Sequence, residues 1–276
     1  MVPSVTGVGI INRVDYSMPP RALPIAAALL CLAVHVAGGE AATESNATIQ
    51  LHGHAQRLVV SGVPTGQPVI VSSGDGGWIH LAPHVAEVLA AKGFHVVGFD
   101  TRAYLETFTS RNATLNQDEV KGDYDALAEY ATGPSRRRPI LVGVSEGAGL
   151  SVLAATDAHT RGLIAGLVVL GMPNVNELAW RWRDAVIYLT HSVPKEPTFR
   201  VDQLVDQISP LPLAAVHSTN DEFVPLAEIE RIVGLANQPK KLWTVPASDH
   251  RFSDNLQEFD RRLLDAVAWT TENATR

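Results

Sequence analysis

The chain of 276 residues contains a single cysteine, Cys31, and aromatic residues make up only 6% of it. One cysteine excludes an intramolecular disulfide and a thiolate metal cluster. Basic residues are outnumbered, 22 Lys and Arg against 29 Asp and Glu, so the formal net charge is −7. The basic surface that nucleic-acid binding requires is therefore missing, and we expect no nucleic-acid partner. A hydrophobic content of 46% with 18% charged residues nevertheless indicates a folded globular protein.

The apolar run Leu23–Val36 is shorter than the roughly 20 residues that span a bilayer as a helix. Arg21 precedes the run and small, polar residues follow it, which is the layout of a secretory signal peptide. We therefore expect residues 1–41 to be a signal peptide, with Met18 as an alternative start. Its removal would take Cys31 with it and leave a thiol-free protein in the periplasm or outside the cell.

Residues 42–55 are interpreted as a linker, and residues 56–276 as a single domain. In this domain, short apolar runs rich in β-branched residues alternate with amphipathic stretches. Such alternation predicts a mostly parallel sheet covered by helices on both faces, with catalytic groups at the carboxyl ends of the strands. The expected strands are Arg57–Ser61, Pro68–Ser72, His95–Asp100, Pro139–Val144, Ile164–Leu170, Leu213–Ser218 and Lys241–Val245.

The segment 174–209 lies between two expected strands and is interpreted as a small helical cap. It holds Trp180, Trp182, Tyr188 and Pro194. Caps of this kind select substrates by covering the cleft. Packing of the aromatic residues against the body of the domain is the alternative role for them.

Ser145 follows an expected strand in the sequence Gly143-Val-Ser-Glu-Gly147, and a helix of small residues follows. This is G-x-S-x-G in the strand–turn–helix context of a nucleophile elbow. The turn is so sharp that the residues two before and two after the serine must lack side chains. Ser145 is therefore the candidate nucleophile. The alternative is an ordinary serine that caps the helix.

The acid and the base of a Ser-His-Asp triad are expected later in the chain, in the order acid and then histidine. Asp221 follows the expected strand Leu213–Ser218, and His250 follows the last expected strand. Asp221 would fix the tautomer and orientation of the imidazole. Glu222 and Asp249 are less favoured candidates for the acid, and an ordinary loop position is the alternative for Asp221 and His250.

Two backbone N–H groups are needed to hold the oxyanion of an acyl-transfer intermediate. One belongs to the residue after the nucleophile, here Glu146. The other is assigned to Asp75 or Gly76, in the glycine-rich loop after the expected strand Pro68–Ser72.

No cofactor or metal is expected. The glycine-rich loop lacks the G-x-x-x-x-G-K-[ST] pattern and its lysine, which argues against nucleotide binding. His52 and His54 form an H-x-H pair with no third ligand in register.

Three motifs together resemble one protein family. They are Ser-Gly-Asp-Gly-Gly-Trp at 73–78, Gly98-Phe99-Asp100 followed by Tyr104 and Leu105, and the G-x-S-x-G elbow. The chain resembles, over roughly residues 56–270, the VirJ and AcvB bacterial virulence proteins of the α/β-hydrolase superfamily. The sequence departs from the family pattern at two places. In the family, aromatic residues follow the tyrosine, whereas Leu105 and Glu106 follow Tyr104 here. The family also has an aromatic residue after the serine, where this chain has Glu146.

The resemblance implies an α/β-hydrolase fold and an exported, periplasmic protein. It also implies either hydrolysis of aminoacyl-phosphatidylglycerol, as in AcvB-type members, or a role in type IV secretion, as for VirJ. Trp78, Tyr104 and Asp100 are expected to contact the substrate. Asp75, Asp100 and Glu146 fall on loops at the catalytic edge and could attract an ammonium group, although solvated loop carboxylates are the alternative.

The sequence thus predicts an exported serine hydrolase that cleaves a carboxylic ester of a small molecule or lipid, with a peripheral association with the envelope. The alternatives are a non-catalytic adaptor for secretion or the envelope, built on a hydrolase scaffold, and a thioesterase or peptidase with the same three residues.

Overall fold

The computed structural model describes residues 44–181 and 196–274, which belong to one unit of the chain. The predicted signal peptide at 1–41 lies outside the described residues. So do Trp182, Tyr188 and Pro194 of the predicted cap.

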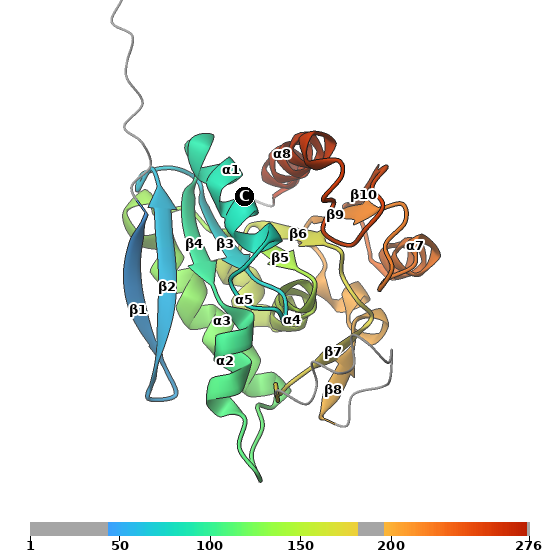
Figure 1. The fold of residues 1–276 in the computed structure, drawn as a ribbon. Coiled ribbons are helices and arrows are strands. Elements are labelled where there is room, and N and C mark those ends of the chain that lie inside the picture. Colours follow the sequence, from blue (N-terminus) through green and yellow to red (C-terminus); the bar gives the residue numbers. More distant parts are fainter. Residues whose placement is uncertain (1–43, 182–195, 275–276) are drawn as a thin grey trace, which may run out of the picture. The chain divides into compact units, whose positions relative to one another are not determined.

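An eight-stranded sheet forms the centre of the fold, in the order β1-β2-β4-β3-β5-β6-β9-β10 (Figure 1). The neighbours from β4 to β10 are parallel, while β1 pairs antiparallel with β2, and β2 antiparallel with β4. This confirms the predicted α/β-hydrolase architecture with a mostly parallel sheet. The strands are β1 Ser45–Leu51, β2 His54–Gly62, β3 Pro68–Ser72, β4 His95–Phe99, β5 Ile140–Val144, β6 Gly166–Leu170, β9 Leu213–Ser218 and β10 Lys240–Val245.

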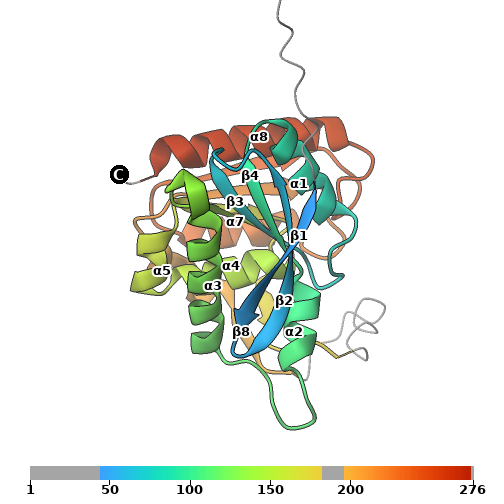
Figure 2. The ribbon, with the colours of Figure 1, turned by 90° about the vertical axis from the view of Figure 1, so that its left-hand side faces the viewer.

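Two apolar cores cover the two faces of the sheet, because successive side chains of a strand point to opposite faces. In β3, Val69 and Val71 join one core and Ile70 joins the other. Helices α1 and α8 cover the first face, and α2, α3, α4 and α7 cover the second, as Figure 2 shows. The helices are α1 Leu81–Ala91, α2 Thr101–Phe108, α3 Gln117–Thr132, α4 Glu146–Ala155, α5 Ala158–Leu163, α7 Leu226–Leu235 and α8 Leu256–Asn273.

The interpretation of residues 42–55 as a linker is wrong, because β1 and the start of β2 occupy most of that segment. Ala47, Ile49 and Leu51 alternate with polar residues and pack on the core of the second sheet face. His52 and Gly53, both with positive φ, make the turn to β2. The alternation was present in the sequence, and a two-residue turn with positive φ is typical of a hairpin.

The described parts of the predicted cap are not α-helical. Strands β7 (Val175–Glu177) and β8 (Thr198–Arg200) pair antiparallel, and two 3₁₀ turns follow at Val201–Gln203 and Val205–Ile208. Trp180 is buried, and the guanidinium of Arg102 lies 3.9 Å from its ring centroid. Of the two roles considered for Trp180, packing against the body of the domain is the one observed.

Tyr104 is a buried side chain that links α2 to α3 through a hydrogen bond. Its side chain is 0% exposed, and its hydroxyl donates a 2.6 Å hydrogen bond to Asp123, which also pairs with His52 at 3.0 Å. Burial, and then the neighbouring Asp123 carboxylate, hold the pKa of Tyr104 well above its ordinary value, so the phenol remains a donor. None of the helices in the described ranges is both long and apolar enough to cross a membrane.

We expect Tyr104→Phe to lower the free energy of unfolding by about 1–3 kcal/mol, because a buried carboxylate loses a hydrogen-bond donor. Urea unfolding measures the change. Tyr130→Phe is the matched control, since Tyr130 is 37% exposed on the adjoining helix. Equal stability of the two variants would contradict the role given to Tyr104.

Candidate active site

Ser145 stands between β5 and α4, in a backbone conformation that residues with a side chain rarely adopt. Its φ is 49° and its ψ is −117°. The Ser145 N–H donates to the carbonyl of Leu170 on β6 at 2.8 Å, which holds the turn against the sheet. Its side chain makes no capping hydrogen bond to α4. The alternative of an ordinary capping serine therefore loses its support.

Two glycines permit this turn, as the sequence predicts. A Cβ atom on Gly143 would lie 2.4 Å from the Cα of Ala148, and one on Gly147 would lie 2.4 Å from the carbonyl oxygen of Ser73. Both contacts are with backbone, which cannot give way. The elbow thus brings β5, α4 and the loop after β3 into direct backbone contact.

Asp221 and His250 are joined by a short hydrogen bond. The Nδ1 atom of His250 lies 2.6 Å from Oδ2 of Asp221, and the Asp221 side chain is fully buried. Oδ1 of Asp221 accepts the N–H groups of Phe223 at 2.9 Å and Val224 at 2.8 Å. Burial alone would raise the pKa of Asp221, but the hydrogen bond and charge of His250 and the two N–H groups lower it below its ordinary value.

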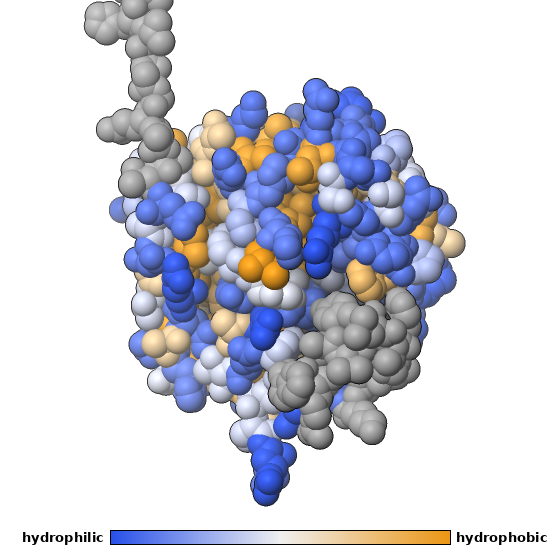
Figure 3. Space-filling model, in the orientation of Figure 1, coloured by the Kyte–Doolittle hydropathy of each residue, from blue (hydrophilic) through white to orange (hydrophobic). Residues whose placement is uncertain are grey.

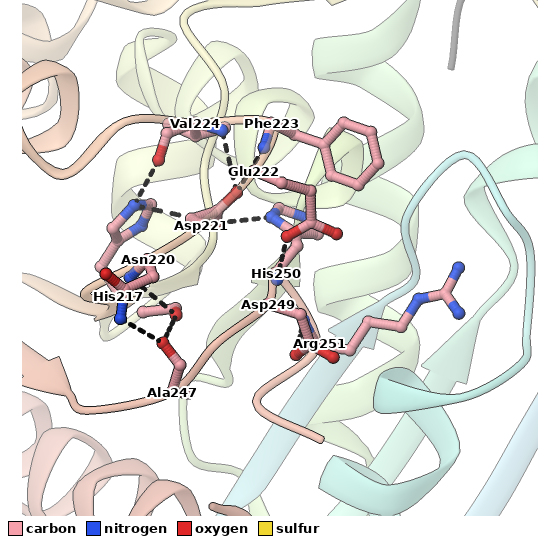
Figure 4. A network of polar contacts seen from close by, with 11 residues as sticks. His217, Asn220, Asp221, Glu222, Phe223, Val224, Ala247, Asp249, His250 and Arg251 are labelled. Carbon is pink, nitrogen blue, oxygen red and sulfur yellow. Dashed lines mark hydrogen bonds and ion pairs between the residues drawn. The ribbon is translucent and has the colours of Figure 1, made fainter. Parts of the chain in front are cut away.

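Further hydrogen bonds join the Asp221 loop to the His250 loop (Figure 4). The N–H of His250 donates to Glu222 at 2.7 Å, so this less favoured acid holds the backbone of the histidine rather than its ring. Ser218 and Asn220 both donate to the carbonyl of Ala247, at 3.0 and 3.1 Å. Asp249, the other less favoured acid, accepts N–H groups of its own loop.

Ser145 and His250 line one cavity of about 360 Å³ at the carboxyl ends of the strands. The imidazole lies over Gly171, just after β6, where a Cβ atom would come within 2.6 Å of Cε1. Because β6 is the neighbour of β5, this position sets the ring beside the elbow. Three segments far apart in the sequence therefore meet at one cavity.

Asp75, Gly76 and Glu146, the residues predicted to donate to an oxyanion, also line this cavity. The N–H groups of Asp75 and Gly76 interact with the Asp75 carboxylate in this structure. Burial raises the pKa of Asp75, while the charge of His250 and these N–H groups oppose the rise.

Glu146 is a buried carboxyl group beside Ser145. One of its oxygens accepts the N–H of Glu177 on β7 at 2.5 Å, so it ties the elbow to the small sheet. Burial, and then the nearby Asp75 carboxylate, hold the pKa of Glu146 well above its ordinary value. A neutral Glu146 is a poor receptor for an ammonium group.

The three residues predicted to contact substrate do not line the cavity. The Trp78 ring packs on β4, where a Cβ atom on Gly98 would fall 2.2 Å from it. Asp100 is the N-cap of α2 and accepts the Ala103 N–H at 3.0 Å. Tyr104 is the buried side chain that donates to Asp123, as described above. The prediction for Tyr104 is therefore wrong, because its side chain is fully buried, while contact of Trp78 and Asp100 with the substrate stays a prediction.

Three exposed apolar residues at the cavity were missed by the sequence reasoning. Ile79 is 51% exposed, Phe223 41% and Val175 36%, and each comes from a different segment. Their signal was weak, because a lone apolar residue in a loop has no periodicity. In Figure 3 apolar surface reaches the centre of this face among polar groups. Within the described ranges, no three His, Cys, Asp or Glu side chains are grouped so as to hold a metal ion.

The fold matches known α/β-hydrolase structures. Est1E from Butyrivibrio proteoclasticus is 17% identical, with a TM-score of 0.59 over 82% of this chain and 98% of its own. A dienelactone hydrolase from Anabaena variabilis is 13% identical, with a TM-score of 0.61 over 83% and 99%. A membrane phospholipase A described as a bacterial virulence factor is 14% identical, with a TM-score of 0.57 over 82% and 86%. The chain therefore has the α/β-hydrolase fold.

Within that fold, residues 67–179 match the family model of the bacterial virulence protein VirJ, which confirms the resemblance drawn from the motifs. An uncharacterised protein of Mycobacterium tuberculosis is 24% identical over 216 residues, 76% of this chain and 72% of its own length. The protein YfhR of Escherichia coli O157:H7 is 22% identical over 199 residues, 71% and 68% of the two chains.

We expect Glu146→Gln to raise the melting temperature at pH 8 and to change it little at pH 4. A carboxyl with a raised pKa in the fold binds more protons folded than unfolded, so wild-type stability falls as pH rises above the ordinary pKa. The amide is already neutral and still accepts the Glu177 N–H. Thermal unfolding of both proteins from pH 4 to 8 measures the difference. A difference independent of pH would mean that Glu146 is ionised in the fold.

Proposed function

We propose that the chain is an exported serine hydrolase that cleaves carboxylic esters, with Ser145 as nucleophile, His250 as general base and Asp221 as the acid that orients it. The observation that carries the proposal is the 2.6 Å bond between Asp221 and His250 at a cavity that Ser145 also lines. The signal-like segment at 1–41 supports export to the periplasm or beyond.

The proposed reaction has two halves. His250 removes the proton of the Ser145 hydroxyl as the oxygen attacks the ester carbonyl, and Asp221 stabilises the imidazolium that forms. The Glu146 N–H, with that of Asp75 or Gly76, holds the oxyanion. His250 then gives its proton to the departing alcohol. Water repeats the sequence on the acyl-enzyme and releases a carboxylic acid, so the serine is regenerated.

An apolar acyl group suits the cavity best. Ile79, Val175 and Phe223 give it exposed apolar walls, with Val144 and Val224 beside them. Burying such a group contributes about 0.8 kcal/mol for each CH₂ removed from water. Similar structures include, by name, an esterase domain from Rhodothermus marinus, a dienelactone hydrolase and a phospholipase A, which supports ester substrates with small or lipid acyl groups.

Among lipid esters, we propose aminoacyl-phospholipids as the first candidates, on the resemblance to AcvB-type proteins. Asp75 is our candidate for the contact with the substrate's ammonium group, since it lines the cavity, whereas Glu146 is turned to the N–H of Glu177 and Asp100 caps a helix.

The central test is Ser145→Ala. We expect labelling by a fluorophosphonate to vanish and ester turnover to fall by about 1,000-fold or more, as removal of a triad member does. Ser45→Ala is the control, because Ser45 is an exposed residue on β1. The substrate panel contains p-nitrophenyl esters, a thioester and aminoacylated phosphatidylglycerol. Equal labelling of wild type and Ser145→Ala would refute the proposal, and a wild type inert on the whole panel would favour the adaptor.

A second test concerns the apolar wall. We expect Phe223→Ala to lower kcat/KM for a hexanoyl ester about 5- to 20-fold more than for an acetyl ester, because only the longer chain reaches the lost ring. The ratio of the two kcat/KM values measures this effect. Val63→Ala is the control, since Val63 is 47% exposed and does not line the cavity. An unchanged ratio in Phe223→Ala would place the acyl group elsewhere.

A further inference from the structure

His217 lies near the end of β9, four residues before Asp221, and is 0% exposed. It does not line the cavity, and the proposed reaction gives it no role. On an internal strand such as β9, an apolar residue is the usual occupant of a fully buried position, because burying a polar side chain costs free energy unless its polar atoms are hydrogen-bonded. Its contacts show how they are used.

The tautomer of His217 follows from its partner. Nε2 lies 2.8 Å from the carbonyl oxygen of Val224, which can only accept, so Nε2 carries the hydrogen. Oδ2 of Asp221 lies 3.8 Å from the same nitrogen. Nδ1 is buried and has no hydrogen-bond partner within the described ranges. Burial lowers the pKa of His217, in keeping with a neutral ring.

Val224 is consequently held through both of its backbone polar groups. Its N–H donates to Oδ1 of Asp221 at 2.8 Å, and its carbonyl accepts from His217 (Figure 4). The turn from Asp221 to Val224 is thereby attached to the rigid strand β9 at its far end. Oδ2 of Asp221, the oxygen that faces His250, belongs to the carboxylate that this turn orients.

We propose that His217 is a positioning residue that fixes the Asp221–Val224 turn through the Val224 carbonyl and so keeps the Asp221 carboxylate aimed at His250. The inference rests on the proposed function. His217 touches neither substrate nor the reacting atoms, so its loss acts through the geometry of the acid and not through binding. A misplacement of the order of 1 Å at such a site lowers the rate by up to about 100-fold.

Two amide variants separate this role from a general contribution to packing. In His217→Gln the side-chain nitrogen can take the place of Nε2 and donate to Val224. In His217→Asn the shorter side chain places its nitrogen near the position of Nδ1, too far from the Val224 carbonyl to donate to it. We expect His217→Asn to lower kcat about 10- to 100-fold with KM within about 2-fold, and His217→Gln to keep most of the wild-type kcat.

A third variant separates the loss of the hydrogen-bond donor from a loss of the fold. His217→Met fills the space without a donor and removes the unpaired Nδ1, so we expect it to fold and to show the kcat loss of His217→Asn. Melting temperatures of all variants are measured in parallel. Equal kcat values for the Asn and Gln variants, a loss confined to KM, or rates that simply follow the melting temperature would overturn the proposal.

A direct readout does not depend on turnover. The proton shared by Asp221 and His250 should give a low-field ¹H NMR resonance in wild type and in His217→Gln, and this resonance should weaken or vanish in His217→Asn. Its persistence in His217→Asn would overturn the inference. If wild type labels with no fluorophosphonate, the proposed function fails, while the resonance still decides whether His217 positions Asp221.

Discussion

The hydrogen bond between Asp221 and His250 is the contact on which the candidate site depends. This bond gives the imidazole its orientation, while the ring rests on the bare backbone of Gly171 and meets the Phe223 ring edge to face, with 5.6 Å between ring centroids. The hydrogen bonds to Glu222 and to the Ala247 carbonyl hold the two loops at the distance the bond requires. The carboxyl ends of β9 and β10 supply both loops, so the parallel sheet sets their separation.

The same cavity combines acidic and apolar surroundings. Burial raises the pKa values of Asp75 and Glu146 beside Ser145, and at Asp75 the charge of His250 opposes the rise. Ile79 and Phe223 add exposed apolar surface at the cavity. The exposed apolar surface fits the proposed ester substrate with an apolar acyl group.

The sequence predicted most strands of the large sheet and the placement of Ser145 and His250 at one edge of it, because each follows a strand and the edge of a parallel sheet gathers such residues. The sequence did not predict the features that depend on the direction in which a side chain points. Tyr104 belongs to a recognisable motif, yet only helix α2 determines that its hydroxyl points to Asp123. Strand β1 lies in a short segment soon after the predicted signal peptide, and Phe223 has no periodic apolar neighbours in the sequence. His217 looked like an ordinary strand residue, since its use depends on a turn seven residues away.

The backbone angles of Ser145 have a thermodynamic consequence. A residue with a side chain in this conformation costs of the order of 1–3 kcal/mol, and glycine would relieve most of it. A chain used only as a scaffold would gain stability from glycine at 145, at no loss to its surface. The chain thus keeps a serine at 145 although this lowers its folding free energy. Such a cost favours a chemical role for the Ser145 hydroxyl over the role of a passive scaffold.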